Sequence, residues 1–413
     1  MNGGVRRVVI TGAGGISPLG NDWESVQSHL HECRNAVRRM DTWDIYDGLN
    51  TKLAAPAVDF ELPPHYNRKT TRSMGRVALM AVRTSEIALG EAGLLGDPIL
   101  RSGKVGVSNG SSAGTHSAMG DFGRMLNQHT TEGINATTYI KMMSHTAPVN
   151  VGVFFGLTGR VITTSSACTS GSMGIGCAYE IVRSGKQVAM LAGGCEQMDA
   201  TASAVFDTLF ATSVRNDEPG LTPRPFDAAR DGLVLGEGAC TLIVEDLEHA
   251  RARGARIMAE IVGYGSNSDG AHVTQPSAET MAVAMRLALE DAGLPPEAIG
   301  YVNAHGTATD HGDIAESMAT SQVFGARIPI SSLKSYMGHT LGACGALEAW
   351  LSIEMMRNEW FAPTLNLDRL DPRCAELDYI TGGGRALQAE YVMSNNFAFG
   401  GINTSLVFRR WEH

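Results

Sequence analysis

Apolar positions recur at helical spacing in two separated stretches that end in the same way. In the first, Ala78, Leu79, Val82, Ile87 and Leu89 fall roughly on one face, which predicts a helix over 77–93. The second stretch, 281–293, has the same character, and both end in Ala-Gly-Leu, where glycine is the expected left-handed stop. A short apolar strand is expected after each helix, at 104–108 and at 301–304.

The chain repeats a longer pattern around these helices. A β-type run at 161–168 precedes a small-residue helix to about 184 and a strand at 187–192. A run at 328–334 likewise precedes a small-residue helix to about 358 and a strand at 391–394. Alternating strands and helices predict an α/β layered fold, here with two similar halves joined near 250–260. Such patterns are common, so a coincidental match stays open.

Composition and charge narrow the class of protein. The 413 residues are 43% hydrophobic and 18% charged, which is typical of a compact globule and excludes general disorder. The net charge of −10 argues against a protein-wide nucleic-acid surface, although a local basic patch remains compatible with it. No run of about 18 apolar residues predicts a membrane span. The seven cysteines are scattered without a Cys-x-x-Cys pair, which favours a reducing cytoplasm over disulfides or zinc.

Three motifs have alternative interpretations that we consider weaker. The run at 12–15 follows a strand like a dinucleotide fingerprint, but Ser17 stands where the third glycine would fall, so a tight turn is favoured. The elbow-like sequence at 110–114 would make Ser112 a hydrolase nucleophile. His305, Asp310, His311 and Asp313 are ligand-type residues without standard metal spacing, so a catalytic loop with one working histidine is favoured there.

One cysteine and two histidines carry the strongest chemical signal. Cys168 lies between a β-type run and a glycine- and serine-rich helix, where the helix N-terminus is expected to lower its pKa and favour a thiolate. His305 and His339 each follow a predicted strand beside glycine. Such a cysteine can accept an acyl group, and two neutral imidazoles can donate to a developing enolate oxygen. Lys334 could hold a histidine neutral or orient it.

At these residues the chain resembles the type I/II β-ketoacyl-acyl-carrier-protein synthases of the thiolase superfamily. The motifs are SSACTSG at 165–171, RPFDAARDG at 224–232, VNAHGTATDHGD at 302–313, SSLKSYMGHTLGACGALE at 331–348 and SNNFAFGGIN at 394–403. The resemblance implies the thiolase fold, an α/β five-layer αβαβα sandwich of two pseudo-repeated halves, residues 1–255 and 256–413. It also implies a dimer.

The resemblance further implies a role for each matching residue. Cys168 takes an acyl chain as a thioester, and His305 and His339 assist decarboxylation of malonyl on a carrier protein. The product is a 3-oxoacyl chain two carbons longer. The backbone N–H groups of Cys168 and Phe399 form the oxyanion hole, and Phe399 is also the gate. The remaining implied features are a Lys334–Glu316 pair, a supporting Asp313, and a structural Na or K ion at Asn303, Glu348, Ser394 and Asn395, with no other cofactor.

The implied partner is an acyl carrier protein. Carrier proteins are acidic, so docking onto this acidic chain needs a local basic patch, expected at Arg68, Lys69 and Arg72. A homodimer is expected, and a heterodimer with a chain-length-factor homologue stays open. Leu233 replaces the usual phenylalanine beside the reaction centre. The motifs SSACTSG, SSLKSYMGHTLGACGALEAW and SNNFAFGGIN are similar to those of ketosynthases from aryl-polyene or type II polyketide clusters. A coenzyme A thiolase would need a second reactive cysteine near the C-terminus, where this chain has Phe399.

Overall fold

The computed structural model describes residues 5–412, and their framework is one 11-stranded sheet with the order β13-β11-β10-β15-β16-β9-β1-β8-β6-β4-β5. Its strands are β1 (Val8–Ile16), β4 (Val105–Gly110), β5 (Val161–Thr163), β6 (Ala189–Glu196), β8 (Gly238–Asp246), β9 (Ala259–Ser268), β10 (Ile299–Asn303), β11 (Pro329–Ser331), β13 (Asp378–Tyr379), β15 (Tyr391–Ala398) and β16 (Ile402–Arg410). Shorter strands form two small sheets, β2 (Arg38–Arg39), β3 (Leu53–Ala55) and β7 (Leu235–Gly236) in one, and β12 (Trp360–Phe361) and β14 (Arg385–Ala386) in the other.

The large sheet repeats one topology in its two halves. From β1 outward, β8 and β6 pair antiparallel, and β4 and β5 then continue in parallel. From β9 outward, β16 and β15 pair antiparallel, and β10 and β11 continue in parallel. The two series meet where β1 and β9 pair antiparallel over three residues. The doubled pattern of the sequence is therefore a doubled topology within one sheet.

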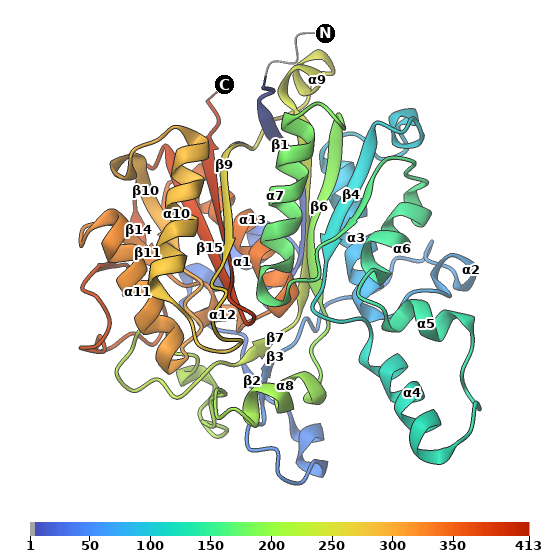
Figure 1. The fold of residues 1–413 in the computed structure, drawn as a ribbon, viewed down its shortest axis with the longest axis horizontal. Helices are drawn as coiled ribbons and strands as arrows, with labels where there is room; N and C mark the ends of the chain where they lie inside the picture. The colour runs from blue at the N-terminus through green and yellow to red at the C-terminus, as the bar shows by residue number, and fades with distance from the viewer. Residues whose placement is uncertain (1–4, 413) are drawn as a thin grey trace.

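Helices complete five layers around the two halves of the sheet (Figure 1). Helices α3 and α6 cover the outer face of the first half, and α10 and α11 cover that of the second. Helices α7 and α13 lie between the halves and build the largest buried apolar cluster with strands from both. The helices are α1 (Trp23–His31), α2 (Arg68–Thr71), α3 (Arg76–Glu91), α4 (His116–Gln128), α5 (Ala136–Met142), α6 (Thr146–Phe155), α7 (Ser170–Arg183), α8 (Ala200–Asp207), α9 (Leu247–Ala252), α10 (Ala278–Ala292), α11 (Asp310–Phe324), α12 (Lys334–Met337) and α13 (Cys344–Arg357).

The glycine run near the N-terminus is not the tight turn that the sequence suggested. Strand β1 continues through it to Ile16, with a register shift between Ile10 and Gly12. A Cβ at Gly12 or Gly14 would collide with backbone oxygens of α3. The glycines are therefore needed because a helix packs directly on the strand.

The long small-residue helix expected over 334–358 is interrupted. Helix α12 ends at Met337, Gly338 adopts a φ of 66°, and α13 begins only at Cys344. This break places His339 on a turn rather than on a helix face. Within residues 5–412, no helix combines the length and apolar character that crossing a bilayer requires.

Candidate active site

The three residues singled out for chemistry follow the carboxyl ends of parallel strands. Cys168 lies in a short 3₁₀ turn, η3 (Ala167–Thr169), between β5 and α7. His305 follows β10, and His339 follows α12 after β11. Ligands of open α/β sheets bind at this edge, so the topology brings side chains from both halves to one place.

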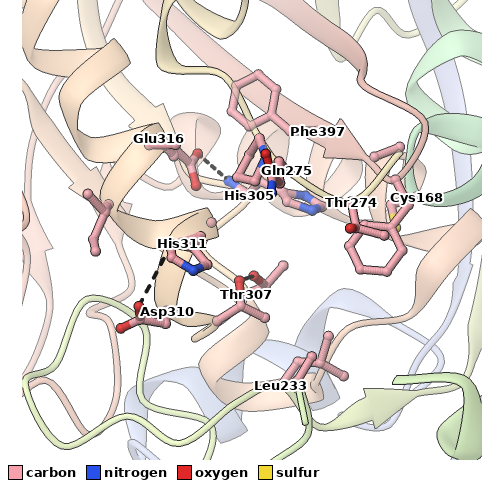
Figure 2. A pocket seen from close by; sticks show the side chains of 18 of the residues that line it. Cys168, Leu233, Thr274, Gln275, His305, Thr307, Asp310, His311, Glu316 and Phe397 are labelled. Atoms are coloured by element: carbon pink, nitrogen blue, oxygen red, sulfur yellow. Dashed lines mark hydrogen bonds and ion pairs between the residues drawn. The ribbon is translucent and has the colours of Figure 1, made fainter. Parts of the chain in front are cut away.

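The structure brings Cys168, His305 and His339 together. His339 Nε2 lies 3.0 Å from Cys168 Sγ, and a ligand atom of each of the three residues lies within 4.8 Å of the others. The two imidazole rings meet edge-on, with centroids 5.1 Å apart and planes at 90°. All three are buried, at 5%, 7% and 2% exposure, but they line an open cavity of about 950 Å³ (Figure 2). One reacting carbonyl placed between them could contact all three.

The sequence-based expectation of a lowered cysteine pKa is wrong for this structure. Burial raises the pKa of Cys168 to about 12, although the Lys334 ammonium and the backbone N–H groups of Phe399 and Cys168 act in the opposite direction. Desolvation outweighs them because the thiol is buried. Cys168 therefore rests as a thiol, and His339 Nε2 is the group placed to take its proton.

Both histidines are held neutral, as the sequence suggested. Burial lowers the pKa of His305 and of His339 well below the ordinary range, and the charge of Lys334 lowers both further. The amide Nδ2 of Asn396 lies 3.5 Å from His305 Nδ1. Among residues 5–412, His339 Nδ1 has no hydrogen-bond partner, so its ring can carry the proton on either nitrogen. Neutral imidazoles can still donate an N–H to a developing oxyanion.

Lys334 does not pair with Glu316, contrary to our expectation. Its ammonium donates to Glu348 on α13, and both side chains are almost fully buried, at 1% and 0% exposure. Burial lowers the pKa of Lys334, but Glu348 more than restores it, so the net pKa is raised and the lysine stays charged. Glu316 instead accepts the backbone N–H groups of His305 and Gly306, at 2.7 and 2.6 Å. Burial raises the pKa of Glu316 to about 8.

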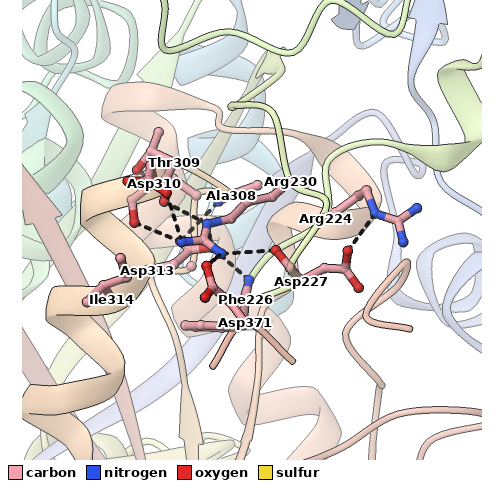
Figure 3. A network of polar contacts seen from close by, with 12 residues as sticks. Arg224, Phe226, Asp227, Arg230, Ala308, Thr309, Asp310, Asp313, Ile314 and Asp371 are labelled. Atoms are coloured by element: carbon pink, nitrogen blue, oxygen red, sulfur yellow. Dashed lines mark hydrogen bonds and ion pairs between the residues drawn. The ribbon is translucent and has the colours of Figure 1, made fainter. Parts of the chain in front are cut away.

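Asp313 belongs to a polar network that sequence reasoning largely missed (Figure 3). It accepts the backbone N–H groups of Phe226 and Ala308, at 2.7 and 3.1 Å, and burial raises its pKa to about 6. The buried guanidinium of Arg230 lies 3.7 Å from it and donates to Asp371 at 2.7 Å and to the Thr309 carbonyl at 3.2 Å. The network thus fastens the loop carrying His305 to the segment that leads to Leu233. The sequence feature that could have indicated this network is Arg230, the arginine near the end of the 224–232 motif.

Two further side chains near the centre were not singled out. The thiol of Cys344 donates to the Cys168 carbonyl at 3.2 Å. Asn396 donates to Glu348 Oε2 at 2.7 Å while facing His305. Both lie within the quoted motifs, but nothing in their spacing indicated these contacts.

The expected cation set does not form a cradle. Lys334 and Asn396 occupy the two carboxylate oxygens of Glu348, and an ammonium there repels a metal ion. Asn303 donates to Ser394 Oγ at 3.3 Å, and Asn395 Oδ1 accepts from a serine at 2.7 Å. Within the described range, Asn303 Oδ1 is the one side-chain oxygen of the set without a donor.

Apolar side chains shape the cavity beside the sulfur. Leu233 and Phe206 belong to one buried cluster with Cys168, and Phe399 packs against it, its ring centroid 5.4 Å from that of Phe206. Leu233 also lines the cavity in Figure 2. The gate expected at Phe399 thus lies beside the nucleophile, on the turn between β15 and β16.

The weaker motifs gain no support from the geometry. Ser112 donates its backbone N–H to Glu196 at 2.8 Å, and burial raises the pKa of that carboxyl to about 7. His311 is largely exposed, and Asp310 pairs with arginines. Over residues 5–412, neither belongs to a group with converging metal ligands. The candidate docking residues Arg68, Lys69 and Arg72 are exposed on and just after α2.

Comparison with known proteins agrees with this geometry. Residues 5–250 match the family described as Beta-ketoacyl synthase, N-terminal domain, and residues 258–368 match its C-terminal domain. A 3-oxoacyl-[acyl-carrier-protein] synthase 2 from Synechocystis is 36% identical, over 98% of this chain and 99% of that protein. The crystal structure of a Beta-ketoacyl synthase from Burkholderia phymatum is 61% identical with a TM-score of 0.98, covering 98% of this chain and all of that one.

Two further solved structures are more distant. The ishigamide ketosynthase/chain length factor is 31% identical with a TM-score of 0.88, and a type II PKS ketosynthase in complex with its acyl-carrier protein is 29% identical with a TM-score of 0.87. Each covers 99% of this chain and 100% of the solved one. These matches extend over nearly the whole length of the sequence. With the thiolase-type layering and the converged cysteine and histidines, they show that this chain belongs to the beta-ketoacyl synthase family.

Proposed function

We propose that this chain is a 3-oxoacyl-[acyl-carrier-protein] synthase that extends an acyl chain by two carbons on Cys168. The 3.0 Å approach of His339 Nε2 to Cys168 Sγ, with His305 completing the set, carries this conclusion. The relatives named above supply the reaction class. A buried thiol, two neutral imidazoles and an open cavity are the parts that this reaction needs.

The first step is acyl transfer to the cysteine. Cys168 Sγ attacks the thioester carbonyl of an acyl carrier while His339 Nε2 takes the thiol proton. We assign the stabilisation of the oxyanion to the backbone N–H groups of Cys168 and Phe399, both of which act on the Cys168 sulfur. The carbon–sulfur bond to the carrier breaks, and its departing sulfur takes the proton from His339. The products are an acyl-Cys168 thioester and a free carrier thiol.

The second step is condensation with malonyl on a carrier. Loss of carbon dioxide leaves an electron pair that is delocalised onto the thioester oxygen, to which His305 and His339 can each donate an N–H. The enolate carbon then attacks the acyl-Cys168 carbonyl, the carbon–sulfur bond breaks, and the Cys168 sulfur regains one proton from solvent. The 3-oxoacyl chain stays on the second carrier.

The direct test is the mass of the protein after incubation with acyl carriers. The chain should gain one acyl group, mapped to Cys168, and lose it on addition of malonyl carrier. Cys168→Ala should gain none, whereas Cys240→Ala, which changes a buried cysteine of β8, should behave like the unchanged protein. Condensation of acyl and malonyl carriers by Cys168→Ala would refute the assignment.

We further propose that an acidic acyl carrier protein docks at Arg68, Lys69 and Arg72. These side chains are exposed, and within the described part of the chain none forms an ion pair, although the net charge is −10. Charge reversal at all three should raise KM for acyl carrier more than tenfold. It should leave kcat and the rate with a small acyl thioester unchanged, because rim charges act mainly on association. An unchanged KM would refute this site.

Assembly through β5 is a further proposal. This strand ends the large sheet, and Val161 on it and Val153 on α6 are half-exposed or more. An unpaired edge with apolar neighbours suits a second copy of the chain. Light scattering should give a homodimer, which Val161→Pro should weaken. A monomer that becomes active only with a chain-length-factor homologue would favour the heterodimer instead.

A further inference from the structure

The two catalytic histidines differ in what lies next to Nδ1 of the ring. Among residues 5–412, Nδ1 of His339 has no partner, whereas Nδ1 of His305 lies 3.5 Å from the amide nitrogen Nδ2 of Asn396. Both rings are neutral, because burial and the charge of Lys334 lower their pKa values. A neutral imidazole carries one proton, on one of its two nitrogens. For His305 the contact with Asn396 therefore decides which nitrogen that is.

The orientation of the Asn396 amide is fixed by its other contacts. Nδ2 donates to Glu348 Oε2 at 2.7 Å. Reversing the amide would turn its carbonyl oxygen towards the carboxylate that is paired with Lys334, so that two acceptors would face each other. In the observed orientation that oxygen, Oδ1, lies beside Gly345, where an added Cβ would come within 2.8 Å of it. The nitrogen end of the amide is therefore the end that faces His305.

The second hydrogen of this amide determines the proton of His305. Nδ2 carries two hydrogens and accepts none, and one of them is used by Glu348. Nδ2 also lies 3.5 Å from His305 Nδ1 and 3.6 Å from Cys344 Sγ, whose own proton goes to the Cys168 carbonyl. A separation of 3.5 Å is long for a hydrogen bond, yet a proton on Nδ1 would point at an N–H and be repelled. The ring proton is thus left to Nε2.

The ring of His305 is held in place with Nε2 towards the cavity. Its backbone N–H donates to Glu316, and its ring meets the rings of His339 and Phe397 at steep angles, with centroids 5.1 and 6.1 Å away (Figure 2). Asn396 is fully buried, whereas His305 lines the cavity, so Nδ1 is on the protein side of the ring. An N–H on Nε2 is therefore available to an oxygen bound in the cavity.

We propose that Asn396 is a positioning residue that keeps the proton of His305 on Nε2, so that His305 is a constant N–H donor to the enolate oxygen. His339, whose Nδ1 faces no such donor in the described part of the chain, remains free to accept the thiol proton at Nε2. This inference rests on the proposed function and divides its work between the two histidines.

The tautomer of His305 can be observed without any substrate. The protein would be labelled with ¹⁵N at Nδ1 of histidine only, and the signal of His305 identified by its loss in His305→Ala. Protonated and unprotonated imidazole nitrogens have well-separated ¹⁵N chemical shifts. We expect an unprotonated Nδ1 in the unchanged protein. Asn396→Leu keeps a similar shape without the donor, so its signal should move towards the protonated position.

The rates of the two steps test the same assignment. Acylation of Cys168 uses His339, whereas condensation uses both histidines. Losing one oxyanion donor typically costs about 10²–10³-fold, and here only part of the molecules lose it, so Asn396→Leu should slow condensation with malonyl carrier at least ~10-fold. Acylation by octanoyl carrier, followed by intact mass, should change less than about twofold because His305 acts only in the later step.

Comparing the two steps distinguishes positioning from a general structural effect. The charge of Lys334 lowers the pKa of both histidines, so a disturbance of its pair with Glu348 would alter both steps. A matched control is Asn150→Leu on α6, because Asn150 is also buried, at 2% exposure, and its amide donates to the Thr146 carbonyl at 2.8 Å. This control should leave the ratio of the two rates unchanged.

The outcomes separate this inference from the proposed function. A protonated Nδ1 of His305 in the unchanged protein would overturn the inference, and this measurement does not depend on whether Asn396→Leu folds. Equal slowing of acylation and condensation by Asn396→Leu, or no slowing of condensation, would also overturn it, and the synthase would remain. If no carrier acylates Cys168 in the unchanged protein, the proposed function fails and the role at the enolate fails with it.

Discussion

Replacing Lys334 with methionine tests how the site holds its charges. Lys334 and Glu348 are buried together, and the second carboxylate oxygen of Glu348 accepts the amide of Asn396, at 2.7 Å. Methionine keeps an unbranched stem of similar volume, so the main change is the loss of the ammonium. Removing one partner of a buried ion pair typically costs about 3–5 kcal/mol, because the other charge is left uncompensated. We expect Lys334→Met to lose that much of its free energy of unfolding near pH 8.

The pH dependence distinguishes a charge effect from a packing effect. Without Lys334, burial still raises the pKa of Glu348, which is already raised in the folded protein, and the amide hydrogen bonds that lower this pKa are unchanged. A carboxyl with a folded pKa above its unfolded value of about 4.3 penalises the folded state at higher pH. The penalty is complete above the folded pKa and shrinks as pH falls towards the unfolded one. The deficit of Lys334→Met in urea unfolding should therefore be smaller at pH 5 than at pH 8.

A double variant supplies the decisive comparison. Lys334→Met with Glu348→Gln removes both charges and keeps an oxygen to accept the Asn396 amide, so it should recover most of the lost stability at pH 8. The reasoning would be refuted if the single variant matched the unchanged protein at pH 8. It would also be refuted if the double variant were no more stable than the single one.

The folded double variant also reports on catalysis. Lys334 lowers the pKa of both catalytic histidines, so without it these pKa values should rise and the rings should protonate at higher pH. The acidic limb of the condensation pH profile should move to higher pH accordingly. A profile that overlays that of the unchanged protein would show that Lys334 does not set the protonation of the histidines.

Two other positions give separable outcomes. Arg230→Met should cost about 3–5 kcal/mol in urea unfolding because the buried carboxylate of Asp313 loses its arginine, while Asp371 keeps Arg373. Arg373→Gln, whose half-exposed side chain binds the same Asp371, should cost under about 1 kcal/mol. Equal losses would contradict the burial argument. Leu233→Phe enlarges a side chain in the cluster around Cys168. Relative to the unchanged protein, acylation of this variant followed by intact mass should be slowed more for bulky chains than for short ones. An equal effect on both would exclude a role of Leu233 in chain selection.

Much of the architecture could be predicted because it depends on local pattern. The repeated helix ends, the strands before small-residue helices and the placing of Cys168 and His305 after strands all follow from periodicity and turn residues. Parallel strands then bring those positions to one edge. The separation of these residues along the chain does not keep them apart in the structure, because the sheet topology brings the ends of their strands to one edge.

The errors arose where packing decides between alternatives. Glu316 and Glu348 are both buried beside Lys334, and only the packing of α13 places Glu348 on the ammonium. The thiol pKa was misjudged because a helix N-terminus can be read from sequence, while the depth of burial that outweighs it cannot. The β1 glycines were misjudged for a similar reason, since the helix that requires them begins some 60 residues later.

The doubled topology explains why there is one reaction centre rather than two. The turn η3 before α7 has a counterpart in η6 (Leu341–Ala343) before α13, and both begin with a non-glycine residue of positive φ, Ala167 at 52° and Leu341 at 44°. Such backbone costs on the order of 1–3 kcal/mol and persists only where surrounding structure enforces it. The two turns pack against each other between the halves, one carrying Cys168 and the other following His339. The single centre at the junction therefore uses the strained turns of both halves. Neither half alone could supply both the thiol and the imidazole that faces it.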